Sequence, residues 1–392
     1  MQLDINDEFE KSKSLLDTIL RPLHWFGIWS PQRSIMDDVK FSILVTYFTI
    51  HLVMMCYDLI MVFGDLESIV LNLMESGVQS IFMLRVLVLR FRKHFNLIVI
   101  SLRDEISDGN YKDSFERNTH VEFSSMARFY DRIVMTLGII SSFSWYLMPL
   151  QNYILAWLFN GEMTLNYPYR MFGGNNSSST KWNVIIYIYQ TPVTFFPICY
   201  LSSYGLMMMA IIHICEHMAI LSYRINNLSE YEKTYDVLSN LMGEFVEKRT
   251  KALRLTKIIA DGFDTVLLYE LIITTVLVSL ISYNILLNID NFAVLEIATS
   301  TLFVISIMAV IYGYCFMGQF LITESENLAA ACYGCAWHEM PIHFQRSLLI
   351  FMKSSQIPLQ LTAGRFYVYS YRNFTNIMKS SAAYVSMLRA VI

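Results

Sequence analysis

Seven long apolar runs constrain this chain more than any other feature, because each exceeds the ~20 residues that a helix needs to cross a bilayer. Backbone groups in lipid have no water to bond, so such runs fold as membrane helices. The composition agrees: 55% of residues are hydrophobic and 16% charged, against about a quarter charged in soluble domains. The runs are Phe41–Phe63, Leu66–Leu89, Phe129–Phe159, Asn183–Ile212, Thr265–Asn288, Phe292–Gly318 and roughly Phe366–Ala390. The sequence therefore predicts an all-α membrane protein with seven transmembrane helices.

The distribution of Lys and Arg sets the expected orientation of these spans. The segment before the first span and the loops after the second, fourth and sixth hold 22 of them, and the other loops hold two, Arg170 and Lys181. Because positively charged loops stay inside the cell, we expect a cytoplasmic N-terminus and, after seven crossings, an extracellular C-terminus. Residues 1–40 lack the apolar core of a signal peptide. Asn175 and Asn176 begin N-x-S sequons on the outer side and are candidate glycosylation sites.

The cytoplasmic loops carry helical patterns of their own. Leu238, Leu241 and Phe245 recur at intervals of three and four, so spans four and five are expected to continue as amphipathic helices. The connection after span six is expected to be mostly helical up to Pro358. Together these pieces predict a helical intracellular anchor domain suited to contacts between subunits. The alternative is a domain that packs only within its own chain.

The last predicted span is the least apolar, but its polar and small residues form one stripe. Asn373, Asn376, Ser380, Ala383 and Met387 recur at intervals of three and four, which places them on one helix face. Polar groups facing lipid are costly, so this stripe should face protein or water. One explanation is an interface of small residues between helices. The other is a pore wall, in which Met387 is a hydrophobic constriction and the chain is expected to end at the outer mouth.

Three stretches in the last third of the chain resemble the insect odorant receptor family. They are YGYCFMGQFLITESENLAAACYGCAW (Tyr312–Trp337), SSQIPLQLTAGRFY (Ser354–Tyr367) and FTNIMKSSAAYVSMLRAV (Phe374–Val391). The first contains the spacing Tyr333-x-x-x-Trp337 that is found in this family. The seven-span inverted topology agrees with the resemblance over the rest of the chain.

The resemblance implies a tetrameric cation channel whose last helix lines a central pore. By position, Met387 occupies the narrow gate, and Ser380 and Ala383 lie on the pore face below it. The family works with an obligatory co-receptor, which carries T-Y-x5-Q-F/L where this chain has Ala383, Tyr384 and Ala390. The chain is therefore expected to be a ligand-tuning subunit of an odorant-gated, non-selective cation channel, in the plasma membrane of olfactory sensory neurons. Its expected partners are the co-receptor, a small volatile odorant and the bilayer.

The resemblance also implies a ligand site in the outer half of spans two, three, four and six. At 1.5 Å per residue, a position ten residues from the outer end lies ~15 Å deep. An apolar, aromatic lining with few polar groups suits a volatile molecule; for each residue alone, core packing is the alternative. The residues at this depth are Met74, Glu75, Val78, Ser142, Trp145, Met148, Gln190, Thr191, Thr194, Phe195, Thr301, Val304 and Ile305.

Glu75 is the sharpest candidate among them. A carboxylate ten residues inside a span is expensive and usually functional. It is expected to bond Gln79 or Tyr146, or to contact an amine or hydroxyl of the ligand. Glu270 and Glu296 lie closer to the ends of their spans and are interpreted as interfacial.

The expected regions follow from these assignments. They are a cytoplasmic N-terminal segment (1–40), spans one to four with the ligand-binding bundle (41–212), cytoplasmic helical extensions (213–264), spans five and six (265–318), a cytoplasmic anchor segment (319–365) and the pore-lining last helix (366–392).

Other chemistry has little support in the sequence. Cys332 and Cys335 with His338 and His343 imitate a zinc or redox site, but reduced structural thiols are the favoured interpretation. No nucleophile–base constellation or phosphate-binding loop is present, so neither an enzyme nor a cofactor is expected. The net charge of −4 gives no sign of a nucleic-acid partner. A gustatory-type receptor channel remains an alternative, and a seven-helix metabotropic receptor would require the opposite orientation.

Overall fold

The structure is a computed structural model that describes residues 2–108, 111, 113–158, 167–171, 180–231, 234–290 and 294–390. The two sequons at Asn175 and Asn176 lie outside the described residues. The described helices are α1 (Gln2–Trp25), α2 (Ile35–Met61), α3 (Leu66–Phe91), α4 (Lys93–Asp108), α5 (Ser114–Leu158), α6 (Thr180–Gln190), α7 (Phe196–Asn226), α8 (Tyr235–Asp290), α9 (Val294–Gly334), α10 (Ile342–Ser355) and α11 (Tyr371–Ala390). Short 3-10 turns are η1 (Thr191–Phe195), η2 (Leu228–Glu230) and η3 (Trp337–Glu339), and two strands are β1 (Thr362–Ala363) and β2 (Tyr367–Val368).

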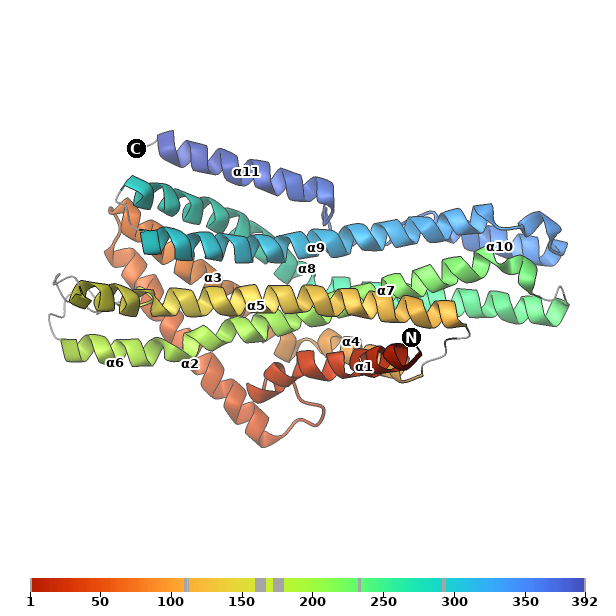
Figure 1. Cartoon of the computed structure of the whole chain (residues 1–392), viewed down its shortest axis with the longest axis horizontal. Coiled ribbons are helices and arrows are strands. Elements are labelled where there is room, and N and C mark those ends of the chain that lie inside the picture. Colours follow the sequence, from red (N-terminus) through yellow and green to blue (C-terminus); the bar gives the residue numbers. More distant parts are fainter. Residues whose placement is uncertain are drawn as a thin grey trace.

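The longest helices, α5, α7, α8 and α9, lie side by side along the long axis of the molecule (Figure 1). Helix α7 occupies the centre, packed against α5, α8, α9 and α1, and nearly all of its residues are buried. This burial follows from its sequence, since a helix that is apolar on every side belongs in a core. Helix α11 lies on the outside of α8 and α9, at the top of the view.

Six helices of the described chain are long and apolar enough to cross a membrane. They are α2, α3, α5, α8, α9 and the combined run of α6, η1 and α7. Helix α11 falls short of this apolar criterion because its sequence includes Arg372 and Lys379 as well as the polar stripe. The seventh predicted span is therefore a helix, but its membrane position depends on what its polar face contacts.

The fourth predicted span is broken in the middle. Pro192 and Pro197 cannot donate the backbone hydrogen bonds of a continuous helix, and between them the chain forms the 3-10 turn η1. The break places the Thr194 carbonyl next to α5, where it accepts a hydrogen bond from the Ser142 hydroxyl at 3.1 Å. The distorted turn is thus fixed directly beside the cavity described below.

The end of the molecule that holds α10 (right in Figure 1) is built from the continuations of the long helices. Helix α8 runs for 56 residues, in line with the expected extension of span five. Buried Arg224 on α7 ties this end together, pairing with Glu116 of α5 and with Glu244 of α8. Burial of a paired charge makes each partner necessary, because removal of one leaves the other unpaired.

A short hairpin precedes α11, where the sequence predicted no strand. Strands β1 and β2 pair antiparallel, with Ala363 opposite Tyr367. The turn needs positive φ at Gly364 and Arg365, which glycine adopts without cost. Asp264 of α8 accepts a hydrogen bond from the Arg365 amide at 2.8 Å, which docks the turn on that helix. The last helix consequently begins at Tyr371 and not near Phe366, as the sequence suggested.

Candidate ligand-binding cavity

A cavity of about 130 Å³ lies inside the bundle, between α3, α5, α7, α8 and α9. An apolar cavity of roughly 150 Å³ in another protein holds a benzene ring, so the space suits one small molecule. Its walls are mainly apolar, with Phe82 and Tyr200 on one side and Phe303 on another. Five of the residues predicted from depth line this cavity: Met74, Glu75, Val78, Ser142 and Trp145.

The residues predicted from span six do not line the cavity. Phe303, Ser306 and Val310 of α9 form the wall, whereas Thr301 and Ile305 are exposed on another face and Val304 is half-buried beside the core. Neighbouring helical residues point ~100° apart. Depth along a helix does not determine which of its faces turns inward.

The predicted residues of span four support the wall without forming it. Gln190 is fully buried and clamps the backbone of Tyr169, accepting from its amide at 3.1 Å and donating to its carbonyl at 2.6 Å. Thr191 bonds Tyr146, Thr194 donates to the Thr191 carbonyl, and Phe195 is exposed. The cavity residues in this part of the chain are Val193, Pro197, Tyr200 and Leu201. On span three, Met148 accepts a hydrogen bond from Thr299 and lies beyond the cavity.

Residues 167–171 form a segment beside the cavity, against the last residue of α6. Tyr169 enters the wall, held by the Gln190 clamp. The next amide, of Arg170, donates to the Glu75 carboxylate at 2.6 Å, and the Arg170 side chain lies 3.6 Å from Asp58. Sequence analysis assigned this segment no role beyond that of an outer loop, although its Tyr-Pro-Tyr run is unusually apolar for a loop.

Glu75 is buried, but its partners differ from those expected. Its carboxyl group accepts a hydrogen bond from the Arg170 amide at 2.6 Å. Neither Gln79 nor Tyr146 bonds it: Tyr146 contacts Thr191 instead, at 2.7 Å. Glu75 therefore joins the segment 167–171 to the wall of the cavity.

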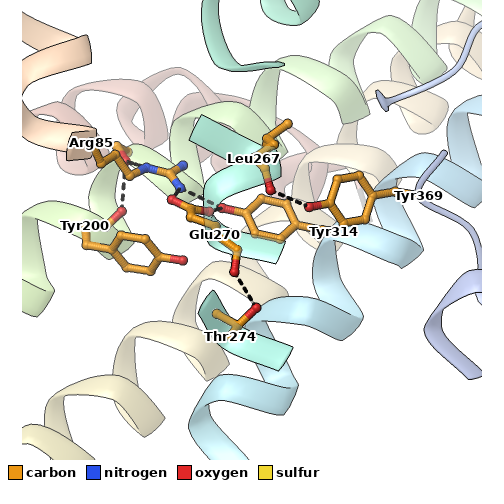
Figure 2. A network of polar contacts seen from close by, with 8 residues as sticks. Arg85, Tyr200, Leu267, Glu270, Thr274, Tyr314 and Tyr369 are labelled. Carbon is orange, nitrogen blue, oxygen red and sulfur yellow. Dashed lines mark hydrogen bonds and ion pairs between the residues drawn. The ribbon is translucent and has the colours of Figure 1, made fainter. Parts of the chain in front are cut away.

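A buried ion pair lies directly beneath the cavity, and Figure 2 shows it. Arg85 of α3 is wholly enclosed and its guanidinium lies 2.5 Å from the carboxylate of Glu270 on α8. The Tyr314 hydroxyl of α9 accepts from Arg85 at 2.6 Å and donates to Glu270 at 2.9 Å. Arg85 also donates to Ser203 of α7. Four helices thus meet in one hydrogen-bonded network.

This network touches the cavity on one side and the segment before α11 on the other. On the cavity side, Tyr200 lies under the guanidinium, with its ring centroid 4.8 Å from the Arg85 Cζ atom, and Thr274 donates to the Glu270 carbonyl. On the other side, the ring of Tyr369 lies 5.5 Å from that of Tyr314, and its hydroxyl donates to the Leu267 carbonyl at 3.2 Å. The interpretation of Glu270 as interfacial was wrong, because Arg85 neutralises it inside the bundle.

The polar stripe of α11 faces away from the chain's own bundle. Asn376, Ser380, Ala383 and Met387 are exposed, whereas Ile377 on a neighbouring face of the helix is buried. Asn373 is the exception. It is half-buried and donates to the Val368 carbonyl at 2.6 Å, which fastens the start of α11 to the hairpin.

The cysteine cluster has the properties of structural thiols. Cys332 and Cys335 are buried, and burial raises the pKa of the Cys332 thiol to about 12. A thiol with so high a pKa stays protonated at neutral pH and is a poor nucleophile and metal ligand. No group of three or more metal-ligating side chains occurs within the part of the chain that the structure describes.

Known proteins similar to this chain form one group. The model of the 7tm odorant receptor family matches residues 81–382. Odorant receptor 13a of Drosophila melanogaster is 27% identical over 195 residues, covering 46% of this chain and 46% of that protein. Odorant receptor 82a of the same organism is 24% identical over 208 residues, covering 53% of each. The matched regions span about half the length of these relatives.

The fold is shared with a solved structure. The insect olfactory receptor OR5 from Machilis hrabei in complex with eugenol superposes with a TM-score of 0.84 at 15% identity, covering 98% of this chain and 100% of that chain. A second structure of OR5 gives a TM-score of 0.78 at 16% identity. These likenesses confirm the predicted all-α membrane fold.

Proposed function

Because this chain belongs to the 7tm odorant receptor family, we propose that it binds a small volatile odorant in the cavity and opens a cation pore lined by α11. It is a multi-pass membrane protein and a receptor, not an enzyme. The observation that carries the proposal is the continuous path of contacts from the cavity, through Arg85 and Glu270, to Tyr369 at the base of α11.

The exposed stripe of α11 supports assembly into a channel. Asn376 and Ser380 would be costly against lipid, and they turn away from the chain's own helices. Several chains arranged around one axis would place these stripes together around water. Ala383 and Ala390, which replace the residues of the co-receptor motif, favour a tuning subunit that joins the family co-receptor in the membrane of an olfactory sensory neuron.

Gating would be a shift between two populated states. A ligand that contacts Tyr200 and Trp145 would bind one arrangement of the cavity wall better than the other. The ion-pair network ties that wall to Tyr369, so the favoured arrangement would move the base of α11 and widen the ring at Met387. The Lys and Arg distribution places the α6 end of the cavity outside the cell, where odorant arrives.

The experiment that tests this function is whole-cell recording from cells that express the chain together with the co-receptor. A broad panel of volatiles should include some that evoke a cation current requiring both subunits. That current should persist when G-protein signalling is blocked. A response that disappears under this block would contradict the channel proposal and favour a metabotropic receptor.

Glu75→Ala is expected to shift the odorant dose–response curve by about tenfold or more without removing the protein from the cell surface. The change removes the acceptor of the Arg170 amide, and leaving a donor unsatisfied at a buried site costs about 1–3 kcal/mol. Glu75→Gln keeps an oxygen at the same place and should have a smaller effect. Unchanged potency for every active ligand would rule out a role for Glu75 at the site.

Gly318→Ala tests the contact between α9 and the base of α11. A Cβ atom at Gly318 would lie far inside van der Waals contact with the Tyr369 carbonyl oxygen, so Tyr369 would have to move. Overpacking of this kind costs about 1–3 kcal/mol, and we expect ligand-evoked current to fall about tenfold at normal surface expression. Gly334→Ala on the same helix meets no atom within 4 Å and is the matched control. Equal currents from the two variants would show that this contact does not transmit gating.

A further inference from the structure

One polar side chain of the cavity wall has no partner. Gln79 of α3 is 2% exposed and lines the cavity, and neither its Oε1 nor its Nε2 atom meets a hydrogen-bond partner among the described residues. Ser141 of α5 also lines the cavity, and its buried hydroxyl is likewise unpartnered there. Buried polar groups are normally hydrogen-bonded, so two such groups facing one apolar space require an explanation.

Four other polar side chains of the wall already have hydrogen-bond partners. Ser142 donates to the Thr194 carbonyl, and Ser306 donates to the Leu137 carbonyl. Thr274 donates to the Glu270 carbonyl, and Glu75 accepts from the Arg170 amide. Gln79 and Ser141 are the lining residues whose buried side-chain polar atoms have no partner in the part of the chain that the structure describes.

We propose that the cavity selects a hydroxylated volatile, an alcohol or a phenol, through Gln79. This inference rests on the proposed function and adds the chemical class of the ligand. The ligand O–H would donate to Gln79 Oε1, and its oxygen would accept from Gln79 Nε2 or from the Ser141 hydroxyl. A hydroxyl both donates and accepts, which is what the unpartnered amide and hydroxyl require.

Other classes of volatile would leave some of these hydrogen-bonding groups without a partner. An ether, ester or ketone accepts but does not donate, so Gln79 Oε1 would stay buried and unpaired. A carboxylic acid is ionised at neutral pH, has no proton for Oε1, and would bring an anion into the cavity that Glu75 lines. The volume of about 130 Å³ further limits the ligand to one ring or a short chain.

The test uses probes that share a hexyl or a phenyl group and carry different polar groups. Cells expressing the chain with the co-receptor would be recorded with hexan-1-ol, 1-methoxyhexane, hexyl acetate and hexane, and with phenol and anisole. Wild type should respond to each hydroxyl compound at about tenfold lower concentration than to its methyl ether, because a site that hydrogen-bonds a hydroxyl rejects analogues without it. In Gln79→Met, which keeps the length of the side chain, this preference should disappear while the ether response persists. Ser141→Ala should reduce it partly.

The possible outcomes distinguish a failure of the hydroxyl inference from a failure of the proposed channel function. Currents evoked equally by alcohols and ethers, or a preference that survives in Gln79→Met, would overturn the hydroxyl inference and leave the channel proposal standing. If no probe evokes current at confirmed surface expression, thermal unfolding of the purified receptor provides the second readout. A stabilisation by hexan-1-ol over 1-methoxyhexane that Gln79→Met removes would support the inference, and its absence would overturn it. Gln79→Met itself should fold at least as well as wild type, because it removes an unpaired buried polar group.

Discussion

Replacing Glu270 with alanine is expected to destabilise the folded chain by about 3–5 kcal/mol, the cost of leaving a buried charge without its partner. The guanidinium of Arg85 is wholly enclosed, and after the substitution it would keep only the hydroxyls of Tyr314 and Ser203. Thermal unfolding of the purified receptor and its amount at the cell surface would both report the loss. Glu326→Ala, at an exposed position on α9, is the control and should change stability by less than about 0.5 kcal/mol.

A double variant separates the structural role of this pair from its role in gating. Arg85→Met with Glu270→Met removes both charges, and apolar replacement of a whole buried pair is often neutral or stabilising. Surface expression should therefore recover. Ligand-evoked current should not, because Tyr314 would lose both charged partners that fix it next to Tyr369. Normal currents from the double variant would show that the network only holds the bundle together.

The membrane spans could be predicted because they depend on composition along the chain, whereas the ion pair depends on which helices become neighbours. Arg85 and Glu270 each lie toward one end of a span, and a charge at that depth is commonly interfacial. They are 185 positions apart in the sequence, and neither segment contains a pattern that predicts its partner. Their pairing follows from the packing of α3 against α8, which the positions of the apolar runs do not specify.

For the cavity, the sequence predicts how deep a residue lies along its helix but not which way its side chain points. The rise per residue was enough to place Met74, Glu75 and Val78 in its wall. It could not assign α9, where Phe303 and Ser306 face the cavity and Thr301 does not. The rotation of a helix about its axis is set by the neighbours it packs against. The lack of a partner for Gln79 could not be predicted from the sequence either, because it depends on every group that surrounds the amide.

The start of the last helix was missed for a local reason. Residues 362–368 turn sharply because Gly364 and Arg365 adopt positive φ, and Asp264 of a distant helix holds that turn. The prediction that the last span begins near Phe366 rested on apolar content alone. In the proposed gating the hairpin matters, because Asp264 holds its turn on α8 and the Tyr369 hydroxyl that follows donates to the Leu267 carbonyl of the same helix.

Cysteine substitutions along α11 are expected to show the largest effect on current and to decide between a pore wall and a packing face. In Met387→Cys, a charged, membrane-impermeant thiol reagent applied from outside should abolish nearly all ligand-evoked current, because it places a charge in a hydrophobic constriction. Ile377→Cys lies on the buried face and should not react. The unmodified chain must be tested in parallel, since Cys56 is itself exposed. Equal, slow reaction at Met387→Cys and Ile377→Cys would favour the packing face.

The position of the gate predicts a further difference between two residues of the stripe. If Met387 forms the constriction near the outer mouth, Cys at that position is reachable from outside whether the channel is closed or open. Ser380 lies seven residues, about two helical turns, further in, so Ser380→Cys should react only while odorant holds the pore open. Reaction of Ser380→Cys at the same rate with and without odorant would place the gate elsewhere. Reaction confined to the open state would show that α11 surrounds a water-filled path that the ligand controls, which a helix–helix interface cannot provide.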